Sequence, residues 1–337
     1  MRVGVLQNSS KQNSFSETMG DHSMPTGQYI ISRVEDGLTH TEAHDLALGL
    51  GGHLAVITSA EENDVVLGML ARDVDSWSFE PRDVARSGPW IGLTQTEGAS
   101  EPGGGWVWET GEESDFTFWH SGQPDNFVND SRALYWEYQG QIGWADHVDD
   151  PVSLGLGYGA IKTAATEFDA GQRKLVGTAE HDFIWGSDVG NLLKGANGND
   201  LLESNGGRDR LDGGNGDDSL TGGIGADSLI GGAGNDDFIY ATIAESKVGT
   251  VGRDRILDFN ADAADQIDLS RIDAIAGGGD DLFSFVGSGR ITALGQVRVY
   301  ESGGNTFIAC NTTGSNAVDM RILVIGLHDF DISDFIL

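Results

Sequence analysis

The sequence predicts a chain of two unlike parts, an α+β domain followed by an all-β parallel solenoid. Three observations lead to this prediction. Seven nonapeptides rich in glycine and aspartate run without a break from Gly177 to Ile239. Ahead of them, residues 28–165 hold two helix signals, several short apolar runs and seven of the eight tryptophans. Behind them, residues 241–337 alternate polar and apolar residues in short runs, which is typical of strands.

The nonapeptides keep two columns in register. Position six holds Asp182, Asn191, Asp200, Asp209, Asp218, Asp227 and Asp236, and position eight holds Ile184, Leu193, Leu202, Leu211, Leu220, Leu229 and Phe238. Glycines at positions one, two and four permit backbone angles that turn carbonyl oxygens toward a shared ion, and each aspartate adds a charged oxygen. Calcium takes six to eight oxygen ligands, so the columns predict a calcium-loaded roll with an apolar interior.

Two nonapeptides make one coil, so alternate repeats are expected on opposite edges. One edge would carry Asp182, Asp200, Asp218 and Asp236, and the other Asp209 and Asp227. Ions between consecutive turns give at most five sites, and fewer are expected because the first two repeats lack the full glycine pattern. Carboxylates on strands ~4.8 Å apart repel by ~3.5 kcal/mol at an effective dielectric constant of 20, so without calcium the roll should be loose or unfolded.

The repeats resemble the repeats-in-toxin (hemolysin-type) calcium-binding family over all 63 residues. A flexible glycine-rich linker is the alternative, but a linker would not keep two columns in register. The resemblance implies calcium as the cofactor. Extracellular modules bind calcium at ~10⁻⁴–10⁻³ M, so such sites would fill outside a cell.

Composition narrows the possible partners. With 53 acidic residues against 20 lysines and arginines the formal charge is −33, which disfavours nucleic acid and anionic lipid as partners. The sequence has no run of about 18 apolar residues, so no membrane span is expected. The lone Cys310 lies in an apolar run and is expected to fill the core. Residues 1–27 form a polar tail without the apolar core of a secretory signal, so either the protein is cytosolic or another signal exports it.

The C-terminal residues 241–337 end in the run Leu327–Leu337. This run is similar to the C-terminal region of serralysin-type proteins, in which a type I secretion machine recognises an uncleaved tail. With the calcium repeats, the resemblance implies a secreted, extracellular protein. The simpler alternative is that the run is only a final core strand.

The resemblance to serralysins does not imply their protease activity. A zinc protease needs the order His-Glu-x-x-His on one helix, and the sequence lacks it. His40 and His44 are four residues apart, but the glutamate between them is misplaced and the stretch opens an amphipathic helix. We therefore expect no enzyme.

Residues 28–165 are predicted to form the α+β domain, with a linker at 166–176. Thr39–Leu50 is predicted to be a helix that ends at Gly51, and Ser59 with Glu62 forms a capping box for a second helix to about Ala71. Short strands are expected at residues 90–93, 106–108, 134–138 and 158–161.

Several motifs of this part, in this order, resemble the C-type lectin-like fold. The framework is matched by residues 51–57, 90–93, 106–108 and 116–119, and the sugar-site loops by Gln123-Pro124-Asp125 and Trp144-Ala145-Asp146. The whole chain is thus predicted to be an α+β C-type lectin-like domain followed by an all-β parallel β-roll solenoid.

The resemblance implies a calcium ion that bridges protein oxygens to two vicinal sugar hydroxyls. It makes Gln123, Asp125 and Asp146 calcium and carbohydrate ligands, with Asp130 as the expected fourth. The family holds the proline of this loop through a cis peptide, which only proline makes cheap. The order Gln-Pro-Asp is associated with galactose-type sugars. Phe127 is expected either to stack on a sugar face or to anchor the loop.

Two departures from the family pattern concern this site. Ala145 stands where the family has Asn, which removes one calcium ligand and one amide donor. The spacing from Gln123 to Asp130 is one residue short of the common pattern, so Ser131 or Glu137 are alternatives to Asp130.

The sequence therefore predicts a secreted, calcium-dependent lectin or adhesin. Its partners would be glycans or polysaccharide on a cell surface and the type I secretion machinery. The cofactor would be calcium, with up to five ions in the roll and one in the lectin domain. The alternative is a protein-binding lectin-like module without a sugar site.

Overall fold

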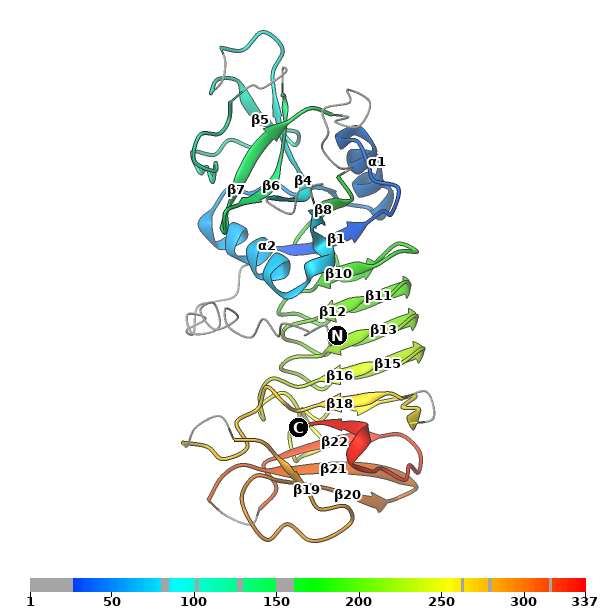
Figure 1. Cartoon of the computed structure of the whole chain (residues 1–337). Coiled ribbons are helices and arrows are strands. Elements are labelled where there is room, and N and C mark those ends of the chain that lie inside the picture. The colour runs from blue at the N-terminus through cyan, green and yellow to red at the C-terminus, as the bar shows by residue number, and fades with distance from the viewer. Residues whose placement is uncertain are drawn as a thin grey trace, which may run out of the picture.

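The computed structural model describes residues 27–79, 85–100, 103–125, 130–149, 161–261, 264–277, 281–314 and 317–337. The chain has its N-terminal part at one end, the repeats in the middle and the C-terminal part at the other end (Figure 1). The strand predicted at 158–161 lies, except for Ile161, outside the described residues, as does Phe127.

The two α-helices begin and end where local chemistry places them. They are α1 (His40–Leu50) and α2 (Ala60–Arg72). Thr39 and Ser59 are the N-caps, each in a capping box with the glutamate three residues later. Gly51 ends α1 with a φ of 91°, a left-handed conformation that favours glycine. Both helices are confirmed to within one residue of their predicted bounds.

The strands of the N-terminal part form a mostly antiparallel sheet. A short 3₁₀ helix, η1 (Val74–Ser76), follows α2. The strands are β1 (Gln28–Arg33), β2 (His53–Leu54), β3 (Ser78–Phe79), β4 (Ala85–Gln95), β5 (Trp106–Trp108), β6 (Arg132–Tyr138), β7 (Gln141–His147) and β8 (Thr163–Phe168). Trp77, Trp90 and Trp144 are fully buried in its two apolar clusters. The sequence did not predict β7, which contains Trp144 and pairs with β6 along its whole length.

Alternate repeats send their strands to two different sheets. One sheet receives β10 (Asp182–Trp185), β12 (Leu201–Glu203), β14 (Ser219–Thr221) and β16 (Asp237–Ile239), and the other receives β9 (Lys174–Val176), β11 (Leu192–Asn197), β13 (Arg210–Asn215) and β15 (Ser228–Ala233). Neighbours within each sheet pair in parallel at an offset of 18 residues, as Leu193 with Leu211 and Leu202 with Leu220 do. The position-eight side chains face one another between the sheets and are all fully buried.

The C-terminal part continues both sheets. Its elements are β17 (Arg255–Ile256), β18 (Gln266–Asp268), β19 (Ser284–Phe285), β20 (Gln296–Ser302), β21 (Asn305–Asn311), β22 (Met320–Val324), the 3₁₀ helix η3 (Ile332–Asp334) and β23 (Phe335–Ile336). Cys310 is fully buried in the core that this part shares with the repeats. Near the end of the chain, β23 pairs in parallel with β18, so the predicted tail is built into a sheet.

One sheet of 14 strands runs from the N-terminal part into the repeats. Strand β1 lies between β8 and β10 and pairs antiparallel with both. Residues 166–176, predicted to be a linker, instead contribute to both sheets: the end of β8 pairs with β1, and β9 pairs with β11. The pairing reaches across more than a hundred residues of sequence, which no local pattern indicates.

Candidate metal and ligand sites

The position-six residues of the repeats form two buried ladders. The backbone N–H of each of the first five residues donates to Oδ1 of the aspartate 18 positions later. The N···O distances are 2.8 Å from Asp182 to Asp200, 2.8 Å from Asp200 to Asp218, 3.0 Å from Asp218 to Asp236, 2.6 Å from Asn191 to Asp209 and 2.8 Å from Asp209 to Asp227. The two rows are those that the repeat pattern predicts.

The second carboxylate oxygen of these aspartates has no protein partner. Among the described residues, Oδ2 of Asp200, Asp209, Asp218, Asp227 and Asp236 is buried without a hydrogen bond. A buried polar atom without a partner costs ~1–3 kcal/mol, more if it is charged. Five such atoms at equivalent positions therefore indicate a row of cation sites rather than scattered packing faults.

The space beside each orphan oxygen is lined by further oxygen. A Cβ added to Gly195 would lie 2.1 Å from Oδ2 of Asp200 and 2.5 Å from the carbonyl oxygen of Gly213. The same arrangement recurs one turn on, where a Cβ on Gly213 would lie 2.2 Å from Oδ2 of Asp218. Carboxylate and carbonyl oxygens are hard ligands, so this donor set fits calcium.

Burial raises the pKa of these carboxyl groups. Burial, and then the charge of Asp182, raises the pKa of Asp200 to about 8, and burial raises the pKa of Asp218 and Asp227 to about 7. The aspartates on neighbouring turns add like charge. The folded ladders thus disfavour the charged form of these carboxyl groups unless a cation neutralises them.

Two residues beyond the nonapeptides extend the ladders. Asp254 accepts from the N–H of Asp227 at 2.9 Å, and its Oδ2 is also buried without a partner. Asp265 accepts from the N–H of Asp236 at 3.1 Å, and its other oxygen accepts from Asn260. Sequence reasoning missed both because they follow their predecessors by 27 and 29 residues rather than 18. Each of these two aspartates precedes a short run of alternating polar and apolar residues, and this strand pattern was the signal in the sequence that could have located them.

A second acidic site lies in the N-terminal part. Asp125, Asp130 and Asp146 each offer a carboxylate oxygen, and these oxygens lie within 4.8 Å of one another. Asp146 is on β7, Asp130 precedes β6, and Asp125 follows the cis peptide bond between Gln123 and Pro124. The structure thus brings together three of the predicted ligands, although the intervening residues 126–129 are not described.

Hydrogen bonds hold this acidic site in place. The N–H of Asp125 donates to both carboxylate oxygens of Asp146, at 3.0 and 3.2 Å. Gln123 donates from Nε2 to Asp125 at 3.2 Å, while its Oε1 is buried and has no partner among the described residues. Burial and the charges of Asp146 and Asp125 raise the pKa of Asp130 to about 7. An amide oxygen and three carboxylates are hard oxygen donors, and this donor set fits a divalent cation.

The two alternatives to Asp130 both contact arginines. Glu137 forms an ion pair with Arg86 across β4 and β6. Ser131 accepts from the side chain of Arg132. Ala145 is buried against Leu134 in an apolar cluster and offers no polar atom.

His40 and His44 are engaged by protein groups. The buried His40 ring contacts the carbonyl oxygen of Ile91 at 3.1 Å, and His44 contacts Glu109 at 2.7 Å. Asp73, Asp75 and His181 form a further group, at the junction with the first repeat. There His181 Nε2 donates to Asp73 at 2.8 Å, and the charge of Asp73, opposing burial, raises the pKa of His181 to about 9. This group is therefore an ion pair that joins the two parts.

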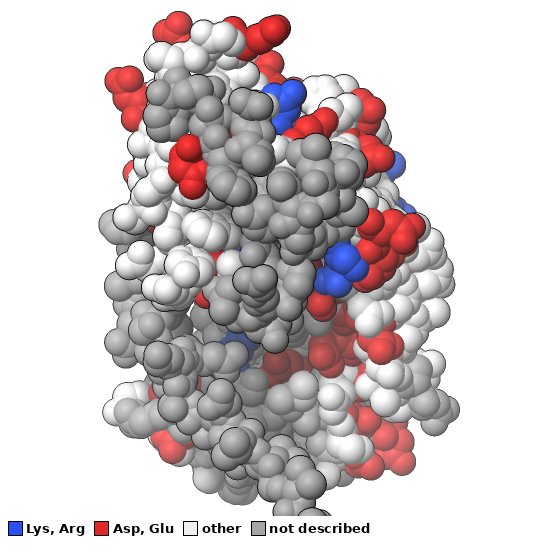
Figure 2. Space-filling model, turned by 45° about the horizontal axis from the view of Figure 1, so that its top comes forward, with Lys and Arg blue, Asp and Glu red and all other residues white. Residues whose placement is uncertain are grey.

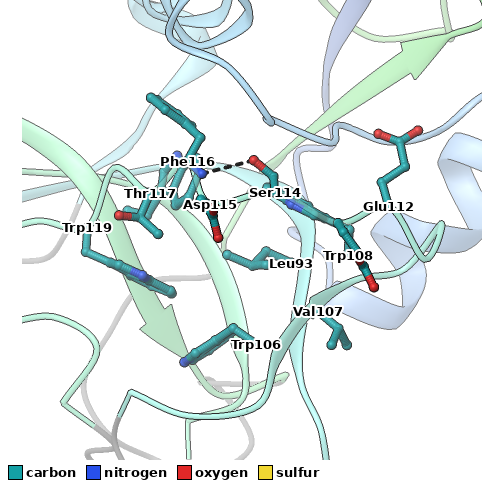
Figure 3. A pocket seen from close by; sticks show the side chains of 12 residues that line it. Leu93, Trp106, Val107, Trp108, Glu112, Ser114, Asp115, Phe116, Thr117 and Trp119 are labelled. Atoms are coloured by element: carbon teal, nitrogen blue, oxygen red, sulfur yellow. Dashed lines mark hydrogen bonds between the residues drawn. The ribbon is translucent and has the colours of Figure 1, made fainter.

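A cavity of about 330 Å³ opens beside the aromatic residues of the N-terminal part. Trp106 and Trp119, with ring centroids 4.9 Å apart, line it together (Figure 3). Its lining also includes the acidic residues Glu112, Glu113 and Asp115. None of the three clustered aspartates lines it. The cavity is thus separate from the acidic site.

Helices in the described residues are too short and too polar to cross a membrane, the longest being α2 with 13 residues. Acidic side chains are spread over the face seen in Figure 2, where basic ones form only isolated spots. This agrees with the net charge of −33.

Comparisons with known proteins find relatives for both parts. Residues 187–337 match the family model described as Peptidase M10 serralysin C terminal. The chain is 37% identical over 116 residues to an alpha-N-acetylgalactosamine-specific lectin of Patiria pectinifera, covering 33% of this chain and 61% of that protein. It is 27% identical over 118 residues to C-type lectin domain family 4 member A of Mus musculus, covering 35% and 43%. The chain thus spans less than two thirds of the length of these curated relatives.

Solved structures give a further likeness. The mouse scavenger receptor C-type lectin carbohydrate-recognition domain matches at a TM-score of 0.29 with 22% identity, over 42% of this chain and 88% of that one. The C-type lectin CEL-I from Cucumaria echinata matches at 0.30 with 20% identity, over 43% and 96%. In sequence, the N-terminal part is thus similar to C-type lectins, and residues 187–337 are similar to the serralysin C-terminal region, with the match beginning within the second repeat.

Proposed function

We propose that this protein is a secreted, calcium-dependent carbohydrate-binding lectin or adhesin. The observation that carries the proposal is the convergence of Asp125, Asp130 and Asp146 on one site beside the unpaired Oε1 of Gln123. Converging carboxylate and amide oxygens are hard ligands that suit calcium, and a calcium ion with open coordination positions can bind hydroxyl oxygens.

Gln123, Asp125, Asp130 and Asp146 would hold the calcium ion. When bound, calcium supplies two open coordination positions for vicinal sugar hydroxyls. The carboxylates accept hydrogen bonds from those hydroxyls, and Nε2 of Gln123 donates one. The side chain of Ala145 contributes neither a ligand nor a donor, so we expect weak affinity for a single sugar and tighter binding to multivalent glycans.

The sugar we propose is of the galactose type. Two observations support it: the order Gln123-Pro124-Asp125, and the relative whose name specifies alpha-N-acetylgalactosamine. Phe127 remains a candidate for stacking on the sugar.

The repeats, in this proposal, form a calcium-loaded β-roll that folds after export by type I secretion. Calcium between consecutive turns would neutralise the orphan carboxylate oxygens. Beyond the five intervals predicted from the nonapeptides, Asp254 and Asp265 add one interval on each edge. Because extracellular modules bind calcium at ~10⁻⁴–10⁻³ M, the roll would remain unfolded inside a cell and fold outside it.

The second candidate is a protein-binding lectin-like module in which calcium is only structural. The observation in its favour is Ala145, which stands where the lectin family has a ligand. Binding to a protein that persists in chelator would support it.

The test is calorimetric titration of the full chain with N-acetylgalactosamine, with and without millimolar calcium. Asp130→Asn keeps the size of the side chain and removes its charge, so we expect sugar binding to be lost while the roll still folds. Asp115→Asn is the matched control, since Asp115 is exposed in the same part of the chain and outside the acidic site. Retained, calcium-dependent sugar binding by Asp130→Asn would overturn the site.

A further inference from the structure

The nine-stranded sheet presents one face to solvent along the repeats and the C-terminal part. Its order is β19, β20, β21, β22, β17, β15, β13, β11 and β9. In each strand every second side chain points to the opposite face. Leu175, Leu211 and Ile256 point into the core and are fully buried, so their neighbours on either side point outward.

The outward positions of this sheet are basic. They include Lys174 on β9, Arg210 on β13, Arg255 on β17, Arg321 on β22 and Arg298 on β20. A sixth cation, Arg253, lies over the outward ring of Phe307 at 5.5 Å. We call these six residues the basic face. They are six of the 20 lysines and arginines in a chain of net charge −33.

None of these six residues forms an ion pair with a carboxylate among the described residues. Elsewhere the pattern differs, since Arg33, Arg72, Arg86 and Lys162 each pair with an acid. The outward strand positions of this sheet hold one acid, Asp212, and it pairs with Lys194 at 3.0 Å. The positive charge of the basic face is therefore left for a partner.

The opposite sheet differs in charge. The outward positions of its strands β12, β14, β16 and β18 hold three acids and no lysine or arginine; Glu203 on β12 is buried and paired with Arg72, which leaves Asp237 on β16 and Asp268 on β18. The row of unpaired cations therefore belongs to the nine-stranded sheet and has no counterpart on these strands.

At the C-terminal end of the basic face, aromatic rings pack against the arginine side chains. Arg298 lies over Tyr300 at 4.5 Å and Arg321 over the same ring at 5.8 Å, and Tyr300 stacks on Phe307 at 5.3 Å. Strand register puts Arg298 and Arg321 on either side of Ala309. The methyl group of Ala309 between them is fully buried, so the two arginine side chains lie next to each other on this face. Guanidinium groups bind carboxylate and sulfate in a bidentate geometry.

We propose that the basic face binds an acidic polysaccharide that lies across the strands. At ~4.8 Å per strand interval, the face from β9 to β20 is about 34 Å long and one strand segment wide, which suits a single linear polymer. Its first strands, β11, β13 and β15, stack along the long axis of the molecule (Figure 1). A nucleic acid duplex is broader and more densely charged, and the net charge of −33 would repel the parts of it that extend beyond the basic face.

The test measures binding of the full chain, in saturating calcium, to hyaluronan and dextran sulfate, with neutral dextran as the comparison. The double variant Arg298→Gln/Arg321→Gln should bind the acidic polymers at least tenfold more weakly. Arg271→Gln/Arg290→Gln removes the same charge from two exposed arginines outside the strands and should bind as the unchanged chain does. Binding should weaken steeply with salt, because it replaces counterions.

Several outcomes would overturn the proposal. They are equal losses in the two double variants, equal binding to neutral dextran, tighter binding to duplex DNA, or light scattering that shows the face joining two copies of this chain. Binding bridged by calcium alone would be insensitive to both double variants and would also contradict it. Asp130→Asn should leave polysaccharide binding intact, so failure of the lectin site and failure of the basic face can be told apart.

Discussion

Removing calcium should make the stability of the repeats fall as the pH rises. In the calcium-free chain, burial holds the pKa of Asp200 at about 8, of Asp209, Asp218 and Asp227 at about 7 and of Asp236 at about 6. Because these values are raised, the folded state binds protons more tightly than the unfolded state. The stabilisation is complete below about pH 4 and is lost as the pH rises through 6 to 8.

The size of this effect is comparable to the whole stability of a domain. One pKa unit corresponds to about 1.4 kcal/mol, so a carboxyl group with a pKa near 7 in place of about 4 contributes ~4 kcal/mol. Because solvent partly screens these carboxyl groups, we take about half of that free energy, or ~2 kcal/mol for each group. Five such groups give ~10 kcal/mol, against a typical stability of ~5–15 kcal/mol. At pH 8 the calcium-free repeats should therefore be largely unfolded.

The assay is thermal unfolding followed by far-ultraviolet circular dichroism at about pH 5 and about pH 8.5. In calcium-free buffer the midpoint should fall with pH. In millimolar calcium it should rise, because protons then compete with the ion for the same oxygens. Asp218→Asn should stabilise the calcium-free protein at the higher pH by ~2 kcal/mol, while the same change at the exposed neighbour Asp217 should not. A calcium-free midpoint that is equal at both pH values, or equal effects at Asp217 and Asp218, would refute the reasoning.

Two further predictions concern single positions. Gly195→Ala puts a methyl group 2.1 Å from Oδ2 of Asp200, so calorimetry should show one calcium ion fewer and a weaker overall affinity, whereas Gly171→Ala, which meets nothing within 4 Å, should bind normally. His181→Asn removes the charged donor of the hydrogen bond to Asp73. The free energy of unfolding of the calcium-loaded chain, measured by denaturant titration, should therefore fall by ~1–3 kcal/mol. Because the pKa of His181 is raised, its stabilising effect is complete below about pH 6.5 and is lost as the pH rises through about 9. The stability of the variant should therefore not show this decrease between about pH 6.5 and about pH 9.

Local chemistry was enough to predict some elements and not others. The N-caps at Thr39 and Ser59 and the glycine after α1 act within a few residues, so the sequence alone locates both helices. The position-six aspartates were predicted because their spacing is constant. Asp254 was missed because a longer loop precedes it. No sequence pattern indicated that β1 pairs with β10, since that contact depends on two surfaces meeting in space.

Strand β1 links the folding of the repeats to that of the N-terminal part. The N–H of Arg33 donates toward the β10 side, to His181, and the N–H of Val34 toward the β8 side, to Lys162. Because bonding directions alternate along a strand, the amides of Tyr29 and Ile31 also face β10, and those of Ile30 and Ser32 face β8. If calcium removal unfolds the repeats, β10 leaves the sheet while β8 remains.

Amide hydrogen exchange should therefore change on alternate residues of one strand. In chelator at pH 8, we expect Tyr29, Ile31 and Arg33 to exchange at least a hundredfold faster than in calcium, and Ile30 and Ser32 to change little. Residue-resolved nuclear magnetic resonance can measure this. Uniform protection along β1 would mean that the N-terminal part holds β10 in place without calcium. Uniform loss would mean that the two parts unfold as one unit, and either result would contradict a boundary of cooperative unfolding between β1 and β10.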